Sequence, residues 1–129
     1  MVFAEGVLDI LTARKNLRIM KIGNMSKLQE YIGERVVDFM CSLPYVDPTR
    51  VGVTGISHGG YMTLMMMLRY PDVYQVGVAG APITDVRNGP RQYIGRFMRT
   101  PDANPDGYAK ADVLAQAGNL KGRLLLVHG

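Results

Sequence analysis

The apolar residues of this chain fall into three short continuous runs. They are RVGVTG at 50–55, QVGVAGAP at 75–82 and RLLLVHG at 123–129. Apolar and polar positions do not alternate within these runs, which is typical of strands buried on both faces of a parallel sheet. The pattern therefore predicts three buried strands.

Two helices are predicted before and between the first two strands. Ser26 and Gln29 have the S-x-x-Q spacing of a capping box, and apolar residues then recur at helical spacing until Pro44. Residues 59–70 are also mainly apolar and end immediately before Pro71, which cannot continue a helix. We expect a helix in each segment.

Strand, helix, strand, loop with helix, and strand is the order of consecutive βαβ units. It predicts an α/β fold with a mostly parallel sheet and helices on both faces. The Gly/Pro-rich segment 84–107 is expected to be a loop, followed by a helix near 108–117. Residues 1–25 show no sustained period and stay unassigned, so the predicted domain covers 26–129.

Charge and hydropathy exclude some function classes. The net charge is +4, and the early basic residues are not interleaved with stacking aromatics, so a solvated face explains them better than nucleic-acid binding. No apolar run is long enough to span a membrane, and the first ten residues lack the charged and apolar regions of a signal peptide. Neither a nucleic-acid nor a membrane partner is expected. Cytoplasmic localisation is the default, although a longer parent could be exported.

Sulfur-containing residues invite a metal or redox function. Cys41 is the only cysteine and lies in an apolar stretch, so a buried structural thiol is favoured over a reactive one. Four methionines cluster in the helix after the first strand. Thioethers alone rarely bind metal, and we expect these side chains to pack in the core: Met62, Met65, Met66 and Met67.

The turn after the first strand has the pattern G-x-S-x-G, formed by Gly55, Ser57 and Gly59, and Gly60 continues it. A serine between a buried strand and a helix is the nucleophile elbow of α/β-hydrolases. Glycines on either side let strand and helix approach closely, and the N–H of the next residue, His58, points at the oxyanion of acyl transfer. The alternative is a tight turn without chemistry, and the strand–helix context favours the elbow.

The surrounding sequence resembles a known family. SLPYVDPTRVGVTGISHGGYMTLMMMLRYPDVYQVGVAGAPITD at 42–85 is similar to the catalytic domain of the prolyl oligopeptidase family of serine peptidases, an α/β-hydrolase fold. The dipeptidyl-peptidase and acylaminoacyl-peptidase branches are nearest. PDANPDGYAKADVLAQAGNLKGRLLLVHG at 101–129 resembles the family's approach to its acid-bearing loop. The resemblance implies a serine hydrolase that cleaves peptides, often after proline or alanine, without a cofactor.

The same resemblance implies roles for individual residues. Ser57 matches the nucleophile, and the N–H of His58 matches one oxyanion donor. Tyr93 and Phe97 in QYIGRFM fall where the dipeptidyl-peptidase branch has YTERY, whose aromatics line the pocket for the residue before the cleaved bond. Gly95 departs from that motif, because it stands where the motif has Glu.

The partners of the serine are harder to place. In the family the acid and the histidine follow the LLLVHG strand, beyond Gly129, so we expect a truncated catalytic domain that is nearly inactive alone. The ring of His58 should point away from the site, and the family implies a structural role for His128. One internal arrangement stays open, in which Ser57, Asp85 and His128 form the triad in the order that the fold requires.

Three functions remain in competition. The leading one is a serine-peptidase catalytic fragment that acts on peptide substrates. A carboxylesterase of the same fold would use the same elbow and oxyanion hole. The third is a non-catalytic remnant, because a half-built sheet exposes strand edges and favours self-association. No carboxylate pairing has metal-ligand spacing, so no metal is expected.

Overall fold

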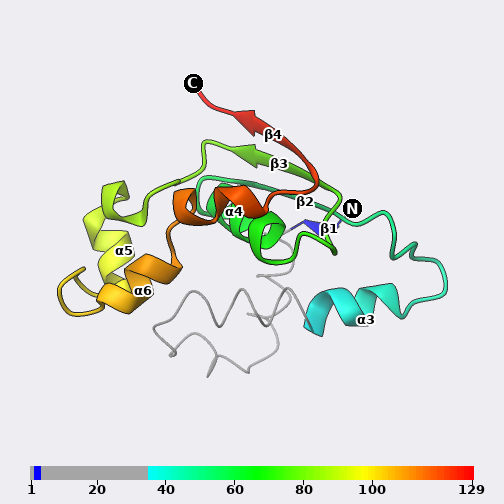
Figure 1. The fold of residues 1–129 in the computed structure, drawn as a ribbon, viewed down its shortest axis with the longest axis horizontal. Coiled ribbons are helices and arrows are strands. Elements are labelled where there is room, and N and C mark those ends of the chain that lie inside the picture. Colours follow the sequence, from blue (N-terminus) through cyan, green and yellow to red (C-terminus); the bar gives the residue numbers. More distant parts are fainter. Residues whose placement is uncertain (1, 4–34) are drawn as a thin grey trace.

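The computed structural model describes residues 2–3 and 35–129 of the chain. Four parallel strands form one sheet in the order β1-β2-β3-β4, with β4 at one edge (Figure 1). The strands are β1 (Val2–Phe3), β2 (Gly52–Ile56), β3 (Val76–Gly80) and β4 (Arg123–Val127). The three predicted strands are confirmed in position, whereas β1 lies in the segment that the sequence left unassigned.

The register brings the carboxyl ends of three strands to the same edge of the sheet. Ile56 of β2 pairs with Gly80 of β3, and Gly80 pairs with Val127 of β4. The residues that follow these strands therefore begin side by side. In open parallel sheets this edge is where ligands bind.

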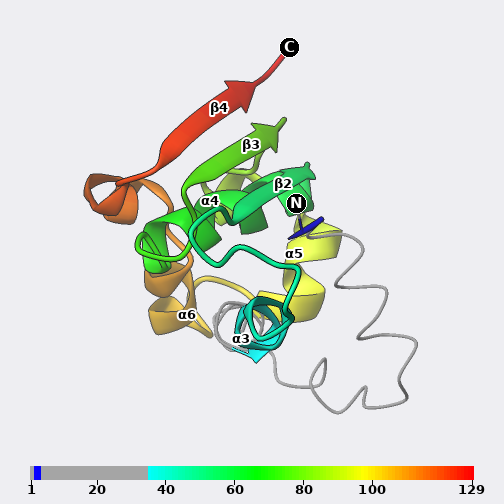
Figure 2. The ribbon, with the colours of Figure 1, turned by 90° about the vertical axis from the view of Figure 1, so that its right-hand side faces the viewer.

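One helix, α4 (His58–Arg69), covers one face of the sheet and forms the centre of the core (Figure 2). It begins one residue earlier than predicted and ends before Tyr70. Its nine residues from Gly60 to Leu68 are all buried. The clustered methionines are among them, which confirms that they pack in the core: Met62, Met65, Met66 and Met67.

Small residues on β3 let α4 lie close to the sheet. Ala79 is fully buried. A Cβ on Gly77 would collide with the Sδ atom of Met67, and its next contact would be the Cγ of Met67 at 3.2 Å. The glycine therefore leaves room for the thioether, which fills the space between helix and strand.

The remaining helices are short. They are α3 (Val37–Cys41), α5 (Arg91–Met98) and α6 (Pro105–Lys110), with the 3₁₀-helices η3 (Val86–Asn88) and η4 (Leu114–Asn119). The capping box predicted at Ser26 and Gln29 lies outside the described residues. Cys41 is half-buried against the core and is not fully buried as expected.

Two predictions about the segment after β3 are wrong. The expected loop 84–107 contains η3 and α5, and the expected helix 108–117 is divided into α6 and η4. The start of α6 explains the second error, because Pro105 occupies its first turn and the Asn104 side chain accepts a hydrogen bond from Gly107 N–H at 3.2 Å. This cap begins the helix three residues earlier than predicted.

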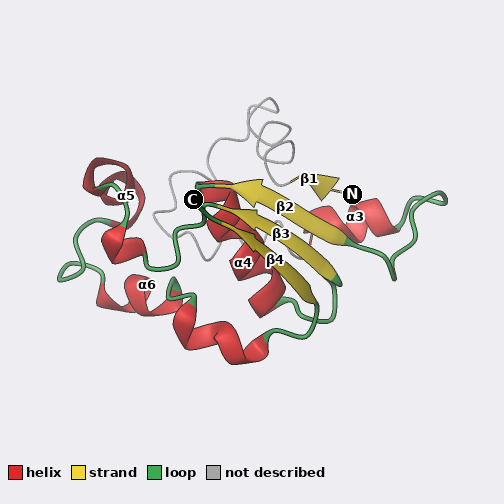
Figure 3. Cartoon of the chain, turned by 90° about the horizontal axis from the view of Figure 1, so that it is seen from above, coloured by secondary structure: helices red, strands yellow, loops and turns green. Residues whose placement is uncertain are grey.

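The opposite face of the sheet is uncovered within the described residues. Seen from above, β2, β3 and β4 lie in front of α4 (Figure 3). Helices were expected on both faces, but no helix in 35–129 packs on this one, where Ile56, Leu125 and Val127 are 66%, 57% and 52% exposed. The expectation that β4 is buried is wrong, because four of its five residues are exposed. The α/β fold class itself is confirmed.

Candidate active site

Ser57 is the single residue between β2 and α4, and its backbone is strained. Its φ is 56° and its ψ is −114°, in a region that side-chain-bearing residues rarely adopt. Such a conformation costs roughly 1–3 kcal/mol and persists only where surrounding contacts enforce it. The turn reverses the chain sharply from strand to helix.

Two backbone hydrogen bonds enforce this conformation. The N–H of Ser57 donates to the carbonyl oxygen of Gly80 at 2.8 Å, and the carbonyl oxygen of Ser57 accepts from the N–H of Tyr61 at 3.0 Å. The first bond ties the turn to the end of β3, and the second begins α4. Ser57 is thus fixed from both sides, while its side chain is exposed.

The glycines around Ser57 are required by close backbone contacts. A Cβ on Gly55 would collide with the backbone of Gly59, so β2 and the first turn of α4 touch at this point. A Cβ on Gly60 would lie 2.6 Å from the carbonyl oxygen of Gly80 and 3.1 Å from the Cα of Pro82. Both glycines therefore permit the approach of strand and helix that a sharp turn demands.

The hydroxyl of Ser57 is not used to cap the helix, although the residue occupies the N-cap position of α4. The hydroxyl therefore makes no capping bond at the carboxyl end of β2. The next residue, His58, is the first of α4, so its N–H lies at the positive end of the helix dipole. An anion formed on a substrate bound to Ser57 would meet this partial positive charge.

The ring of His58 packs along α4. It stacks on Tyr61 with the ring centroids 5.8 Å apart and an interplanar angle of 29°. Burial lowers the pKa of His58 from its ordinary value of 6.5, because desolvation disfavours the charged ring. The imidazole of His58 therefore packs against the surface of α4.

The structure does not bring the internal triad together. Ser57 follows Ile56 and His128 follows Val127, and two strand spacings, about 10 Å, separate these positions. His128 is exposed, with Nδ1 3.0 Å from the carbonyl oxygen of Gly129, so the packed structural role expected for it is not seen. Asp85 accepts a hydrogen bond from Arg87 N–H at 2.9 Å. Asp85 and His128 thus contact residues near them in sequence and not Ser57.

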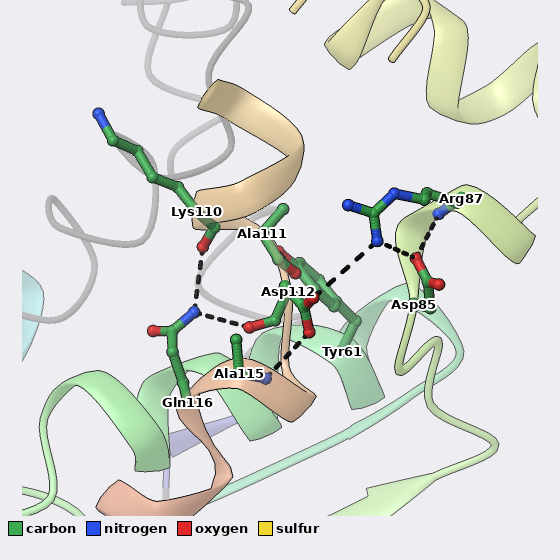
Figure 4. Close-up of polar contacts among 8 residues, drawn as sticks. All are labelled: Tyr61, Asp85, Arg87, Lys110, Ala111, Asp112, Ala115 and Gln116. Atoms are coloured by element: carbon green, nitrogen blue, oxygen red, sulfur yellow. Dashed lines mark hydrogen bonds and ion pairs between the residues drawn. The ribbon is translucent and has the colours of Figure 1, made fainter. Parts of the chain in front are cut away.

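Asp85 instead belongs to a polar cluster that links η3 to the segment before η4 (Figure 4). The Nη1 atom of Arg87 lies 3.6 Å from Asp85 and 3.9 Å from Asp112. Asp112 also accepts from the N–H of Ala115 at 3.0 Å. Sequence reasoning missed this cluster; the D-x-R spacing at 85–87 was the only local signal.

The segment that carries Asp112 is joined to α4 by a hydrogen bond from Tyr61. The Tyr61 hydroxyl donates to the carbonyl oxygen of Ala111 at 3.3 Å, and Gln116 donates to the carbonyl oxygens of Lys110 and Asp112 at 3.1 and 2.9 Å (Figure 4). The Tyr61 bond ties the segment 110–116 to α4, whereas the two Gln116 bonds lie within that segment.

The predicted pocket residues lie on α5. Tyr93 and Phe97 both belong to α5 and are four positions apart in the sequence. The Tyr93 side chain is outside the described part of the structure, and Phe97 packs half-buried against the core. The helix is anchored by its buried residues Ile94 and Met98. A Cβ on Gly95 would have nothing within 4 Å, so no contact requires glycine there.

The described residues contain no group of three or more His, Cys, Asp or Glu side chains placed to hold a metal ion. Among the helices in that part of the chain, none is long and apolar enough to cross a membrane.

A parallel sheet, a strained serine between strand and helix, and a helix N-terminus beside that serine define a partial α/β-hydrolase fold. The sequence profile of the prolyl oligopeptidase family matches residues 34–129. The chain therefore belongs to the prolyl oligopeptidase family, which confirms the resemblance noted in its sequence.

Individual relatives agree with this assignment. A probable dipeptidyl-aminopeptidase B of Penicillium rubens is 36% identical over 119 residues, which are 89% of this chain and 13% of the relative. Human dipeptidyl peptidase 8 is 40% identical over 88 residues, 66% of this chain and 10% of the relative. The crystal structure of Porphyromonas gingivalis dipeptidyl peptidase 4 matches with a TM-score of 0.79 and 36% identity, covering 89% of this chain and 16% of that one. The chain thus spans a small fraction of their length.

Proposed function

We propose that this chain carries the nucleophile of a serine peptidase, with Ser57 as the attacking residue. The observation that supports this most is the backbone of Ser57, with φ 56° and ψ −114° between β2 and α4. The strained backbone of Ser57 stores energy, although its hydroxyl makes no capping bond to α4. This combination is typical of a positioned nucleophile.

In the proposed reaction the Oγ of Ser57 attacks the carbonyl carbon of a peptide bond. The carbonyl oxygen becomes an oxyanion, and the N–H of His58 at the start of α4 stabilises it. A base must accept the hydroxyl proton and return it to the leaving amine, which leaves an acyl-enzyme that water hydrolyses. Gly55, Gly59 and Gly60 would hold this elbow in shape.

In this proposal Ser57 is the nucleophile and the His58 N–H is one oxyanion donor, and no other described residue is assigned as the base. Loss of the base and the acid leaves only oxyanion and binding effects, several orders of magnitude below a full triad. The 129-residue chain alone is therefore expected to turn over substrate very slowly.

The proposed substrates are peptides, because the relatives are named dipeptidyl peptidases. Tyr93 and Phe97 on α5 would contact the residue before the cleaved bond. Cleavage after proline or alanine follows from the family resemblance. We assign these substrates to a complete catalytic domain that contains residues 34–129.

Two assays test the proposal. A fluorophosphonate probe should label Ser57 of the full chain, with Ser57→Ala as the unlabelled control. Turnover of an Ala-Pro anilide, a Gly-Pro anilide and a chromogenic ester should be close to background. Failure of the probe to label Ser57 in folded protein would contradict the nucleophile. Rapid turnover that Ser57→Ala abolishes would contradict the predicted inactivity and support an internal triad.

The elbow alone does not distinguish a peptidase from a carboxylesterase, because both use the same serine and oxyanion hole. Matched peptide and ester substrates on a full-length parent separate the two. The third function, a non-catalytic remnant that associates with itself, is favoured by the exposed apolar residues of β4, among them Leu125 and Leu126.

A further inference from the structure

Asn88 is the only asparagine of the chain that is followed by glycine. It is the last residue of η3, and Gly89 begins the connection from η3 to α5. A backbone amide nitrogen reaches the side chain of the preceding asparagine most easily when it belongs to glycine, because glycine has no Cβ to obstruct the approach. The side-chain amide of Asn88 is therefore open to attack from its own main chain.

The turn that carries Asn88 is weakly restrained. The N–H of Asn88 donates to the carbonyl oxygen of Asp85 at 3.0 Å, and the N–H of Gly89 donates to that of Val86 at 3.3 Å. Hydrogen bonds of this 3₁₀ type have poor geometry, and a single turn of them opens locally at little cost. Each opening releases the nitrogen of Gly89.

Asn119 is a matched position in the same chain. It is also the last residue of a 3₁₀-helix, η4, and the N–H of the following Leu120 donates to the carbonyl oxygen of Ala117 at 3.3 Å. Both asparagines are exposed. The two turns therefore differ mainly in the residue that follows asparagine.

From these observations we propose that Asn88 is a site of spontaneous deamidation, with water as the only co-reactant. The nitrogen of Gly89 gives its proton to solvent and bonds to Cγ of Asn88, while the Cγ–Nδ2 bond breaks and Nδ2 leaves with a proton as ammonia. Water then adds to one of the two carbonyls of the resulting cyclic imide, which opens to aspartate or isoaspartate at position 88. The reaction is independent of the proposed peptidase function.

The modification changes the connection between the polar cluster and α5. Either product adds a negative charge in the residue next to Arg87. Isoaspartate also lengthens the main chain by one carbon immediately before Gly89, which lies so close to Ile94 that a Cβ on the glycine would be 3.0 Å from its Cγ1 atom. The first turn of α5, where the N–H of Ile94 donates to the carbonyl oxygen of Pro90 at 2.9 Å, should therefore loosen.

Peptide mapping by mass spectrometry tests the proposal on the full chain, incubated in its native state at about pH 7 and about pH 8.5. The peptide that contains Asn88 should gain about 1 Da, at least about tenfold faster than the peptide that contains Asn119. The rate should be higher at the higher pH, because the attacking nitrogen must lose its proton. Asn104 should not react by this route, because Pro105 after it has no N–H.

Two variants test the role of the neighbouring glycine. Asn88→Gln should abolish the mass gain at position 88, because the longer side chain closes a larger ring more slowly. Leu120→Gly is the reciprocal variant, since it gives Asn119 the same neighbour as Asn88 and replaces a side chain that is already 38% exposed. It should raise the rate at Asn119 by about tenfold or more. Circular dichroism checks that both variants are folded.

Hydrogen exchange measures the effect on α5. In the isoaspartate form, separated by ion exchange, the N–H of Ile94 should exchange several-fold faster than in the unmodified chain. The N–H of Tyr108 is the matched control, because it donates to the carbonyl oxygen of Asn104 in the first turn of α6. Its exchange should not change, and equal exchange at Ile94 in the two forms would overturn the loosening of α5.

Three results would overturn the deamidation site. The first is an equal rate at Asn88 and Asn119 in the native chain. The second is reaction of Asn88 in urea but not in the native chain, because η3 would then withhold the nitrogen of Gly89. The third is an unchanged rate at Asn119 in folded Leu120→Gly, since the following glycine would then not control the reaction.

Discussion

The backbone N–H of Ser57 donates to the carbonyl oxygen of Gly80 at 2.8 Å, so the turn after β2 is bonded to the last residue of β3. This bond lies just beyond the last paired residues of the two strands, Ile56 and Gly80. It holds Ser57 in a conformation that its own side chain disfavours. The strain at the serine is therefore sustained by the sheet.

Substitutions of Ser57 should reveal this strain as a difference in the free energy of unfolding. Ser57→Gly and Ser57→Ala both remove the hydroxyl, but only glycine adopts a φ of 56° without penalty. The glycine variant should have a free energy of unfolding about 1 kcal/mol above that of the alanine variant, after allowing for the greater freedom of glycine in the unfolded chain. Urea denaturation measures the difference. Equal stabilities would mean that the turn is relaxed.

The close approach of α4 to β3 can be tested at Gly60. Gly60→Ala would bring a Cβ to 2.6 Å from the carbonyl oxygen of Gly80, and should lower the free energy of unfolding by about 1–3 kcal/mol. Gly95→Ala is the matched control, because open space surrounds that position in α5. It should raise stability by about 0.5–1 kcal/mol through helix propensity. Equal effects of the two substitutions would contradict the close contact.

The polar cluster around Arg87 should contribute little stability. Arg87→Met removes its ion pairs with Asp85 and Asp112, and should lower the free energy of unfolding by about 1 kcal/mol or less, because the charges are partly exposed. The loss should shrink in high salt. Lys121→Met, which breaks the exposed pair with Asp72, is the control for a simple surface pair. A loss well above that of the control, unaffected by salt, would show a role beyond charge pairing.

His58 should make stability depend on pH. Burial lowers its pKa in the folded chain, so the unfolded chain binds a proton more readily. Stability should be lost as pH falls below 6.5, the ordinary value for histidine, and the loss should continue until the lowered pKa is passed. Denaturation between pH 8 and about 5 measures this slope. His58→Gln should flatten it, and a slope unchanged in that variant would assign the effect to other groups.

The strands and α4 could be predicted because their signals are local. Continuous apolar runs marked β2, β3 and β4, and the glycines around Ser57 marked a close crossing. The exposure of β4 could not be predicted, because burial depends on which elements pack against a strand and the strand's own sequence does not specify them. The pairing partner of an edge is not encoded in its own hydropathy.

The short elements after β3 were missed for a different reason. Gly89 and Pro90 suggested a loop, but the helix begins directly after the proline and is secured by the burial of Ile94 and Met98. Tertiary contacts outweighed local propensity. The cluster joining Arg87 to Asp112 was equally hidden, because its members are 25 residues apart in the sequence.

The methionine-rich centre of α4 has a consequence for chemical ageing. Met65, Met66 and Met67 are at most 1% exposed, whereas Met40 in α3 is only half-buried. Dilute peroxide should convert Met40 to its sulfoxide while the chain is intact, and should reach the three buried sulfurs only when the core opens. The pattern of sulfoxides along the chain would then record how often α4 separates from the sheet.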